Sequence, residues 1–223
     1  MKVMLLAAGR GERMRPLTDA TPKALLPVGG KPLVARLIDC LAAEGYADLV
    51  INHAHLGAMI EAALGDGSQF GVRIRYSPER AALETAGGIA NALALLGTAP
   101  FLVVNADLHA DYPFARLRGV LAGDAQAHLV LVDNPPHHPG GDFALAEGRV
   151  ANAGGAMLTF SGIGVYRPEL FDGVAPGTRA ALAPLLRAAA TRGQVTGEHY
   201  TGRWVDVGTP DRLARLDAEL GRA

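Results

Sequence analysis

The residues of this chain that could do chemistry begin in a glycine-rich segment near the N-terminus. Gly9 and Gly11 follow an apolar run, Val3–Ala8, that fits a buried strand opening directly into a loop. Neither glycine carries a Cβ, so the backbone can come close to a ligand there. The same region holds four cationic side chains: Arg10, Arg13, Arg15 and Lys23. Cations beside exposed amide N–H groups are typical of a polyphosphate site, which we expect at this loop.

Two common phosphate-binding motifs do not fit the segment. The dinucleotide fingerprint requires G-x-G-x-x-G, and Met14 stands where its third glycine should be. The P-loop requires G-x-x-x-x-G-K-[ST], but Pro32 follows Lys31 where a hydroxyl should hold magnesium. The stretch from Gly29 to Pro32 instead predicts a turn with proline at the first position of a helix.

Two aspartates are candidate metal ligands. Asp107 comes shortly after an apolar strand predicted at Phe101–Val104, and Asp206 lies in the last predicted strand, Trp204–Val207. Ligands of α/β sheets bind at the carboxyl ends of the strands. A carboxylate there, facing the glycine loop, can hold Mg²⁺ against a triphosphate, because Mg²⁺ takes few carboxylates together with phosphate oxygens and water. Each aspartate has an alternative role as a simple cap of the following turn.

Composition narrows the class of protein. The formal net charge is −1, so there is no global basic field and we expect no nucleic-acid partner. Cys40 is the only cysteine; one thiol makes neither a disulfide nor a zinc site, and we expect a small core residue on the apolar side of a helix. No stretch is long enough to span a membrane, and the first apolar run is too short for a signal peptide. We therefore expect no membrane contact and a cytoplasmic location.

Strand and helix patterns alternate along the chain, which predicts an α/β sandwich. The predicted strands are Val3–Ala8, Leu49–Asn52, Val72–Tyr76, Phe101–Val104, Ala127–Val132, Ile163–Tyr166 and Trp204–Val207, with a small hairpin around Phe143–Leu145 and Val150. The predicted helices are Leu33–Leu41, His55–Leu64, Glu84–Leu96, Phe114–Leu121, Ala180–Thr191 and Asp211–Leu220. No linker separates two halves, so we expect a single domain over residues 1–223.

Several motifs resemble those of one enzyme family. The stretch from Leu6 to Thr18 and the Pro22–Leu25 segment resemble the signature of sugar-1-phosphate nucleotidyltransferases, L-A-A-G-x-G-x-R-[ML]-x-P-L-T followed by P-K-[PA]-L. The stretches 79–87 and 204–209 resemble the family's E-x-x-x-L-x-T-A-G and W-x-D-x-G-T segments. The resemblance implies a GT-A-like nucleotidyltransferase fold, a Rossmann-like three-layer αβα sandwich with a mixed central sheet. It also implies an enzyme that joins a sugar 1-phosphate to a nucleoside triphosphate and releases pyrophosphate.

The same resemblance assigns roles to individual residues. Arg13 would hold the leaving phosphates and Lys23 would lie between the two reacting phosphates, while Asp107 and Asp206 would bind Mg²⁺ as the cofactor. The expected nucleotide-binding residues are Ala8, Gly9, Gly11, Arg13, Lys23, Glu79 and Gly87. Gly87 has the alternative role of letting its helix pack closely on the sheet. Residues up to about 110 would bind the nucleotide and residues from about 111 onward the sugar.

The sugar site departs from the family pattern. The resemblance places Ala144, Ser161 and Gly162 against the sugar, with Ser161 where the family has Asn. Many relatives carry E-K-P after the hairpin, and here Val150 is followed by Ala-Asn-Ala-Gly-Gly-Ala. The loss of that acidic residue favours an acidic, bulky sugar, because two carboxylates would repel one another. Over nearly the whole chain, the sequence most resembles family members that transfer uridylyl from UTP to N-acetylmuramic acid 1-phosphate in peptidoglycan recycling.

Other readings stay open. The same fold could use mannose 1-phosphate with GTP, or glucose 1-phosphate with dTTP or UTP. A regulatory module that binds a nucleotide sugar without catalysis is a third reading, although the Arg13, Lys23, Asp107 and Asp206 set argues against it. The four histidines His53, His55, His137 and His138 are interpreted as polar loop residues. Arg179 and Arg203 are interpreted as surface charges, and pairing of either one with the carboxylate of an acidic sugar is the alternative. We expect small-molecule substrates as partners and a monomer or weak homo-oligomer.

Overall fold

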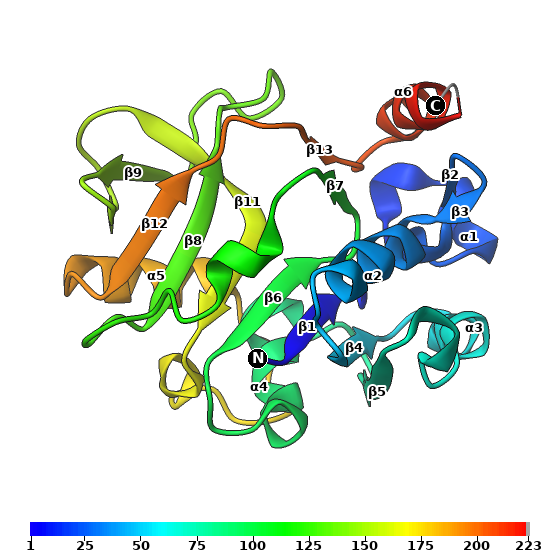
Figure 1. The fold of residues 1–223 in the computed structure, drawn as a ribbon, viewed down its shortest axis with the longest axis horizontal. Helices are drawn as coiled ribbons and strands as arrows, with labels where there is room; N and C mark the ends of the chain where they lie inside the picture. Colours follow the sequence, from blue (N-terminus) through cyan, green and yellow to red (C-terminus); the bar gives the residue numbers. More distant parts are fainter. Residues whose placement is uncertain (222–223) are drawn as a thin grey trace.

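A computed structural model describes residues 1–221 of the chain. Its centre is one mixed nine-stranded sheet in the order β5-β4-β1-β6-β11-β8-β12-β10-β9 (Figure 1). The strands are β1 (Val3–Leu6), β4 (Asp48–His53), β5 (Arg73–Pro78), β6 (Phe101–Asn105), β8 (Ala127–Val132), β9 (Phe143–Ala146), β10 (Arg149–Ala151), β11 (Met157–Tyr166) and β12 (Val195–His199). Strands from both halves of the sequence thus share one sheet. The last two residues of the predicted domain lie outside the described ones.

The sheet has a parallel half and a mixed half. β1 runs parallel to β4 and β6, and β4 runs parallel to β5, so four carboxyl ends meet at one edge. β11 then pairs antiparallel with β6 and with β8, while β12 runs parallel to β8. β6 is therefore the last strand of the parallel run, and its carboxyl end borders the change of direction. Open α/β sheets bind ligands at such a boundary.

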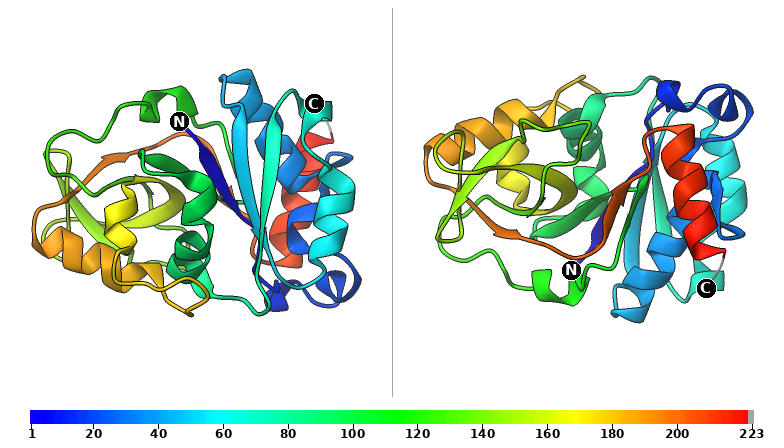
Figure 2. Two further views of the ribbon diagram at one scale, coloured as in Figure 1. Left: turned by 90° about the horizontal axis from the view of Figure 1, so that it is seen from below. Right: turned by 90° about the horizontal axis from the view of Figure 1, so that it is seen from above.

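Helices cover both faces of the sheet (Figure 2). α2 (Leu33–Ala43) and α3 (Gly57–Leu64) pack on one face, and α4 (Glu84–Leu96) and α5 (Leu182–Thr191) pack on the other. β1 shows why both faces are apolar. Val3 and Leu5 point into the α2 side while Met4 points into the α4 side, and all three are fully buried. Burying each such side chain contributes about 1.5–3 kcal/mol. The predicted three-layer α/β fold is confirmed.

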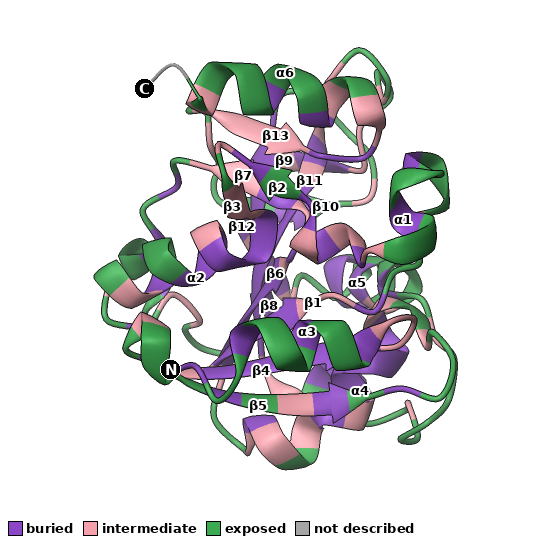
Figure 3. Cartoon of the chain, turned by 90° about the vertical axis from the view of Figure 1, so that its right-hand side faces the viewer, coloured by how far each residue is buried: buried purple, intermediate pink, exposed green. Residues whose placement is uncertain are grey.

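A third apolar cluster joins the C-terminal helix to the glycine loop. Figure 3 shows this helix at one end of the molecule, with most of its residues exposed. α6 (Pro210–Leu220) begins with Thr209, whose hydroxyl accepts the amide N–H of Arg212, and with proline at its first position. Its buried Leu213 and Leu216 contact Met14, which lies in the loop. The cluster also includes Val28 of the short β2–β3 hairpin (Pro27–Val28, Lys31–Pro32), so α6 helps to fix the loop that follows β1.

The smaller elements complete the chain. β7 (Leu108–Ala110) and β13 (Trp204–Asp206) form a separate two-stranded sheet. α1 spans Leu17–Ala20, and short 3₁₀ turns occupy Glu12–Met14, Lys23–Leu25, Ser68–Phe70, Phe114–Leu117 and Pro168–Phe171. Within residues 1–221, no helix combines the length and the apolar character needed to cross a bilayer.

Two expectations from the sequence are wrong, and strands such as β12 were missed. The helix predicted at Phe114–Leu121 is a single 3₁₀ turn that ends at Leu117, because Arg118 is extended and Gly119 adopts a φ of 70°. Strand β12 was not predicted, since its sequence Val-Thr-Gly-Glu-His lacks an apolar run. Cys40 is exposed, not a core residue, because the buried face of α2 passes through its neighbour Leu41 instead.

Candidate active site

The loop after β1 forms one wall of a cavity of about 220 Å³ at the carboxyl edge of the parallel strands. Ala8 and Gly9 line it, together with residues that follow β4, β5 and β6. An Asn52 oxygen accepts the amide N–H of Ala7 at 2.9 Å, which ties the start of the loop to the end of β4. Three of the expected nucleotide-binding residues, Ala8, Gly9 and Glu79, therefore border this cavity.

Glu79 organises the opposite wall of this cavity. Its side chain is buried, and one carboxylate oxygen accepts a hydrogen bond from the Asn52 amide at 2.6 Å. The other oxygen accepts the backbone N–H of Leu83 at 2.8 Å. Both oxygens are thus held by the protein, so Glu79 fixes the turn that leads into α4. A charge buried in this way is stabilised by its donors.

The two glycines in α4 face different neighbours. A Cβ on Gly88 would lie 2.7 Å from both the Asn52 amide and the Glu79 carboxylate. A Cβ on Gly87 would lie 2.2 Å from the backbone oxygen of Thr178, and the Gly87 N–H donates to the Ala180 carbonyl. Gly87 therefore lies under the segment before α5, so its packing role is toward that segment and not toward the sheet as the sequence alternative had it. It does not line the cavity of Ala8 and Gly9.

Lys23 and Asp107 meet across the cleft. The Lys23 ammonium forms an ion pair with the Asp107 carboxylate, and the Lys23 side chain is 12% exposed. A small cavity of about 40 Å³ between them is lined by Gly9, Lys23 and Asp107. Gly11 supports this arrangement with a φ of 65°, and a Cβ there would approach the Lys23 side chain at 3.1 Å. The glycine loop, the lysine and the strand-end carboxylate thus share one site.

Arg13 lies on the exposed side of the same loop. It belongs to the 3₁₀ turn Glu12–Met14, which starts after Gly11 and is anchored by the fully buried Met14. Thr18 closes the loop by donating its hydroxyl hydrogen to the Gly11 carbonyl at 2.8 Å. The loop is therefore fixed at both ends while its arginines face solvent, which suits the capture of an anion.

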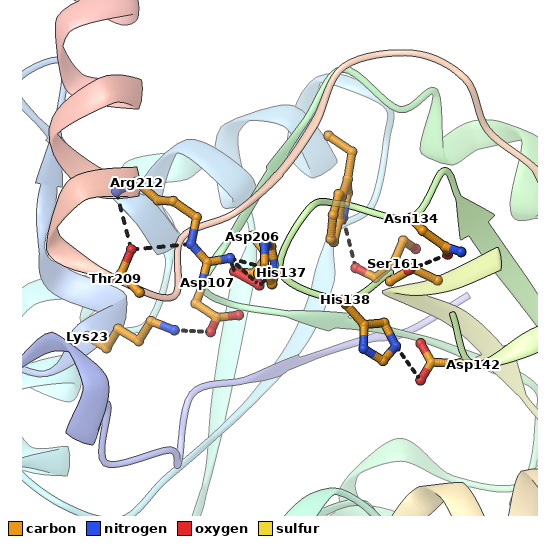
Figure 4. Close-up of polar contacts among 12 residues, drawn as sticks. Lys23, Asp107, Asn134, His137, His138, Asp142, Ser161, Asp206, Thr209 and Arg212 are labelled. Carbon is orange, nitrogen blue, oxygen red and sulfur yellow. Dashed lines mark hydrogen bonds and ion pairs between the residues drawn. The ribbon is translucent and has the colours of Figure 1, made fainter. Parts of the chain in front are cut away.

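Asp206 is brought next to Asp107 by strand pairing. β7 and β13 run antiparallel with Asp206 opposite Leu108, and the Val207 N–H donates to the Asp107 carbonyl at 2.9 Å. Arg212 contacts both Asp206 carboxylate oxygens, at 2.5 and 2.6 Å. His137 lies 3.3 Å from the same carboxylate (Figure 4). The close-up places Lys23, Asp107 and Asp206 on one side of the site, as the sequence reading required.

These two aspartates suit a metal ion that is bound together with its substrate. Within residues 1–221 no three acidic, histidine or cysteine side chains gather into a ready-made metal site. Mg²⁺ does not need one, since it is usually held by one or two carboxylates plus substrate phosphates. Asp107 and Asp206 supply such a pair of hard oxygen donors from adjacent backbone positions. Asp107 is paired with Lys23, and Asp206 is paired with Arg212. An incoming metal ion would have to compete with these two side chains for the carboxylates.

A larger cavity, of about 410 Å³, adjoins the first. The two cavities share Glu84, Thr85 and Asn105. Phe143 and Phe160 from the hairpin and β11, and Leu182 and Leu186 from α5, give the larger cavity its apolar side. Its volume falls within the range of small-molecule sites. A molecule that fills both cavities would cross from the glycine loop to the second half of the sheet.

The expected sugar-binding residues lie behind this cavity wall. Ser161 is buried, donates its hydroxyl hydrogen to the Val130 carbonyl at 2.7 Å and accepts the Ile163 N–H. Gly162 lies where the pairing of β11 with β8 shifts its register, and it has a φ of 82°. A Cβ at this position would lie 2.5 Å from the Asn105 amide nitrogen. Ala144 is buried on β9 beside Phe143. Phe143, Phe160 and Asn105, rather than these three, border the open space.

Comparison with known proteins identifies the family. Residues 2–148 match the family model described as nucleotidyl transferase. The chain belongs to this family. It is 55% identical, over 99% of both chains, to the N-acetylmuramate alpha-1-phosphate uridylyltransferase of Neisseria meningitidis. It is 37% identical, over 99% of this chain and 97% of the relative, to the protein of the same name from Caulobacter vibrioides. The predicted resemblance to sugar-1-phosphate nucleotidyltransferases, and the prediction of an enzyme, are confirmed.

More distant nucleotidyltransferases share the fold. The mannose-1-phosphate guanyltransferase of Aspergillus fumigatus is 30% identical over 94% of this chain and 61% of its own length. A Bacillus anthracis structure described as a glucose-1-phosphate thymidylyltransferase superposes with a TM-score of 0.87, at 23% identity, over 100% of this chain and 96% of its own. A UDP-glucose pyrophosphorylase bound to UDP-glucose gives a TM-score of 0.79 at 18% identity, covering 99% and 98% of the two chains. The last two likenesses bear on the fold alone.

Sequence reasoning missed residues in this nucleotidyltransferase that the loop 133–141 brings to the site. His137 contacts Asp206, and His138 contacts Asp142, which borders the larger cavity. The sequence predicts both histidines to be polar loop residues without a part in the site. A signal was present, because two adjacent polar residues in a proline-rich loop can reach two different partners. Asn52 and Asn105 were also missed, although Asn105 is the last residue of β6 and Asn52 the last but one of β4, close to the strand ends where the rule used for Asp107 applies.

Proposed function

We propose that the protein joins N-acetylmuramic acid 1-phosphate to UTP, giving the UDP-sugar and pyrophosphate. One observation carries the nucleotidyl transfer: two cavities share the wall formed by Glu84, Thr85 and Asn105, and Lys23 and Asp107 meet beside it. The smaller cavity suits the nucleoside beside the glycine loop, and the larger one suits the sugar. The 55% identity to a uridylyltransferase over the whole chain supports the choice of both substrates.

In this reaction an oxygen of the sugar phosphate attacks the α-phosphorus of UTP, the bond to the β-phosphate oxygen breaks, and pyrophosphate leaves with that electron pair. The nucleophile is already an anion, so no general base is needed. Catalysis then consists of positioning two polyanions and stabilising the charge that spreads between them. Lys23 would stabilise the reacting phosphates, and Arg13 would hold the leaving phosphates.

Mg²⁺ is part of the proposal. Asp107 and Asp206 would hold it, and when bound it would neutralise phosphate charge and help to align the attacking and leaving oxygens. Without the ion, the Lys23 and Arg212 side chains keep the two carboxylates from facing one another uncompensated. Those same cations remain available to phosphate oxygens, which is the useful property of a lysine or arginine that borders a triphosphate.

The experiment is a grid of nucleotides against sugar 1-phosphates. Purified protein is assayed for pyrophosphate release with UTP, GTP and dTTP, each combined with N-acetylmuramic acid, N-acetylglucosamine, mannose and glucose 1-phosphates. We expect the highest kcat/KM for UTP with N-acetylmuramic acid 1-phosphate. A maximum for GTP with mannose 1-phosphate, or for dTTP with glucose 1-phosphate, would replace the proposal with one of its alternatives.

The wider setting completes the proposal. A UDP-linked muramic acid is a precursor of peptidoglycan, so an enzyme of this specificity would return a recovered wall sugar to synthesis. We place this reaction in the cytoplasm, where nucleoside triphosphates are made. We expect a monomer or weak homo-oligomer.

A further inference from the structure

Arg187 is a cationic side chain at the wall of the larger cavity. It has no part in the reaction described above. It projects from α5, and its guanidinium carbon lies 5.0 Å from the centre of the Phe143 ring. One of its terminal nitrogens donates to the Asp142 carbonyl at 3.3 Å. Contact with an aromatic face and a carbonyl orients the planar guanidinium without cancelling its charge.

The two carboxylates at the same cavity already have partners within the protein. Asp142 lies 3.1 Å from His138 and accepts the Phe160 N–H at 2.8 Å (Figure 4). Glu84 forms an ion pair with Arg179 at 2.7 Å. Arg187 differs from them, because its contacts are a ring and a backbone oxygen. Among residues 1–221, no carboxylate forms an ion pair with Arg187, so a ligand that enters the cavity with its own carboxylate meets an oriented cation.

The apolar side of the cavity fits the rest of such a ligand. Phe143, Phe160, Leu182 and Leu186 border the space next to Arg187. A carboxylate on a short, methyl-bearing ether branch presents both properties, since the methyl group can contact these side chains while the carboxylate pairs with the guanidinium. A neutral N-acetylated sugar offers Arg187 hydrogen-bond acceptors but no opposite charge.

We propose that Arg187 binds the carboxylate of the acidic sugar 1-phosphate and so sets the preference for that sugar over its neutral counterpart. This inference rests on the proposed function. The lactyl ether of N-acetylmuramic acid is the group that Arg187 recognises, and N-acetylglucosamine is the same ring without it. Arg187 is exposed, so solvent screens the pair, and we expect a preference of about tenfold rather than the larger factor of a buried pair.

The test compares two sugars across matched variants. kcat/KM with saturating UTP is measured for N-acetylmuramic acid 1-phosphate and for N-acetylglucosamine 1-phosphate in the wild type, Arg187→Gln, Arg187→Lys and Arg192→Gln. Arg192 is the matched control, because it is an exposed arginine that follows the same helix and contacts Gln194. Thermal melting shows whether each variant is folded.

We expect Arg187→Gln to lose about tenfold with the acidic sugar, mostly through KM, and to change little with the neutral one. Arg187→Lys should recover part of the loss, Arg192→Gln should behave as wild type, and added salt should shrink the preference. An equal loss with both sugars, or no loss with either, overturns the role of Arg187 while leaving the proposed function intact. If the wild type does not use the acidic sugar with UTP, both the proposed function and the role of Arg187 are overturned. That result is seen with the wild type alone, before any variant is compared.

Discussion

Lys23 and Asp107, which are 84 positions apart in the sequence, form an ion pair at the meeting point of the glycine loop and the end of β6. Lys23 is largely covered, whereas 37% of the Asp107 side chain remains exposed toward the cleft. The pair therefore brings one positive and one negative group to the place where two phosphates would meet. Both signs are needed there, since the lysine can bind phosphate oxygen directly and the aspartate can bind it only through a cation.

Removing Lys23 should slow turnover without unfolding the protein. Lys23→Ala is expected to lower kcat by at least about a hundredfold, the scale of losing one positioned electrostatic stabiliser. Pyrophosphate release measures the loss, and Lys31→Ala is the control, because Lys31 is a partly exposed lysine paired with Asp39 away from both cavities. Near-normal kcat in a folded Lys23→Ala protein would mean that this lysine does not stabilise the reacting phosphates.

Asp206 should affect activity through the metal ion that it is proposed to bind. Asp206→Asn keeps the shape of the side chain but removes its charge, so Arg212 loses its carboxylate partner and a metal ion loses a ligand. We expect the Mg²⁺ concentration for half-maximal activity to rise about tenfold or more. A Mg²⁺ titration of pyrophosphate release, compared with Asp211→Asn from the exposed start of α6, measures the shift. An unchanged Mg²⁺ requirement would leave Asp206 with the structural role of anchoring Arg212.

Gly87 should be required for stability because of its neighbours. Gly87→Ala introduces a Cβ 2.2 Å from the Thr178 carbonyl, a backbone atom that cannot move by itself, so we expect a loss of about 1–3 kcal/mol in the free energy of unfolding. Gly173→Ala is the control, since a Cβ there meets nothing within 4 Å. Chemical denaturation measures the free energy of unfolding of both variants. If the two values are equal, the segment before α5 must shift to accommodate the added methyl group without loss of stability.

The parallel half of the fold was predictable because each strand there is a continuous apolar run. Val3–Leu6 and Phe101–Asn105 are buried on both faces, and such strands give a strong signal. The prediction of Glu84–Leu96 as a helix matched the observed bounds despite its two glycines. β12 and β7 gave no comparable signal, because they are short and carry polar residues whose partners lie far along the chain.

The part of the site in which a sequence motif fixes the backbone was predictable. The part in which tertiary contacts determine which side chains line the cavity was missed. Gly9, Lys23 and Asp107 come together because a loop and a strand end share one edge of the sheet. The cavity wall on the sugar side depends on how β11 bends at Ser161 and Gly162, which turns Phe160 rather than Ser161 toward the open space. Arg187 reaches that wall from α5 only after the helix has packed, so no local pattern could assign it.

The buried His128 and the partly buried His109 should make the stability of the protein depend on pH. Burial lowers the pKa of His128, and burial followed by the charge of Arg203 lowers the pKa of His109. His128 is held by Thr196 through one ring nitrogen, while its other nitrogen is buried without a partner among the described residues. Both rings are therefore more stable neutral in the folded protein than in the unfolded chain.

The sign of the effect follows from these lowered values. Above the unfolded pKa of about 6.5 both states carry neutral rings, and the full stability is present. As the pH falls below that value the unfolded chain binds protons first, so stability is lost progressively until the pH reaches the lower folded pKa. Each ring can add at most about 1.4 kcal/mol of loss per pH unit in that window. His128→Leu should therefore flatten the fall in the free energy of unfolding between about pH 7 and pH 5, measured by denaturant titration at several pH values. His109→Leu should do the same, and an unchanged slope in both variants would show that neither ring resists protonation in the folded state.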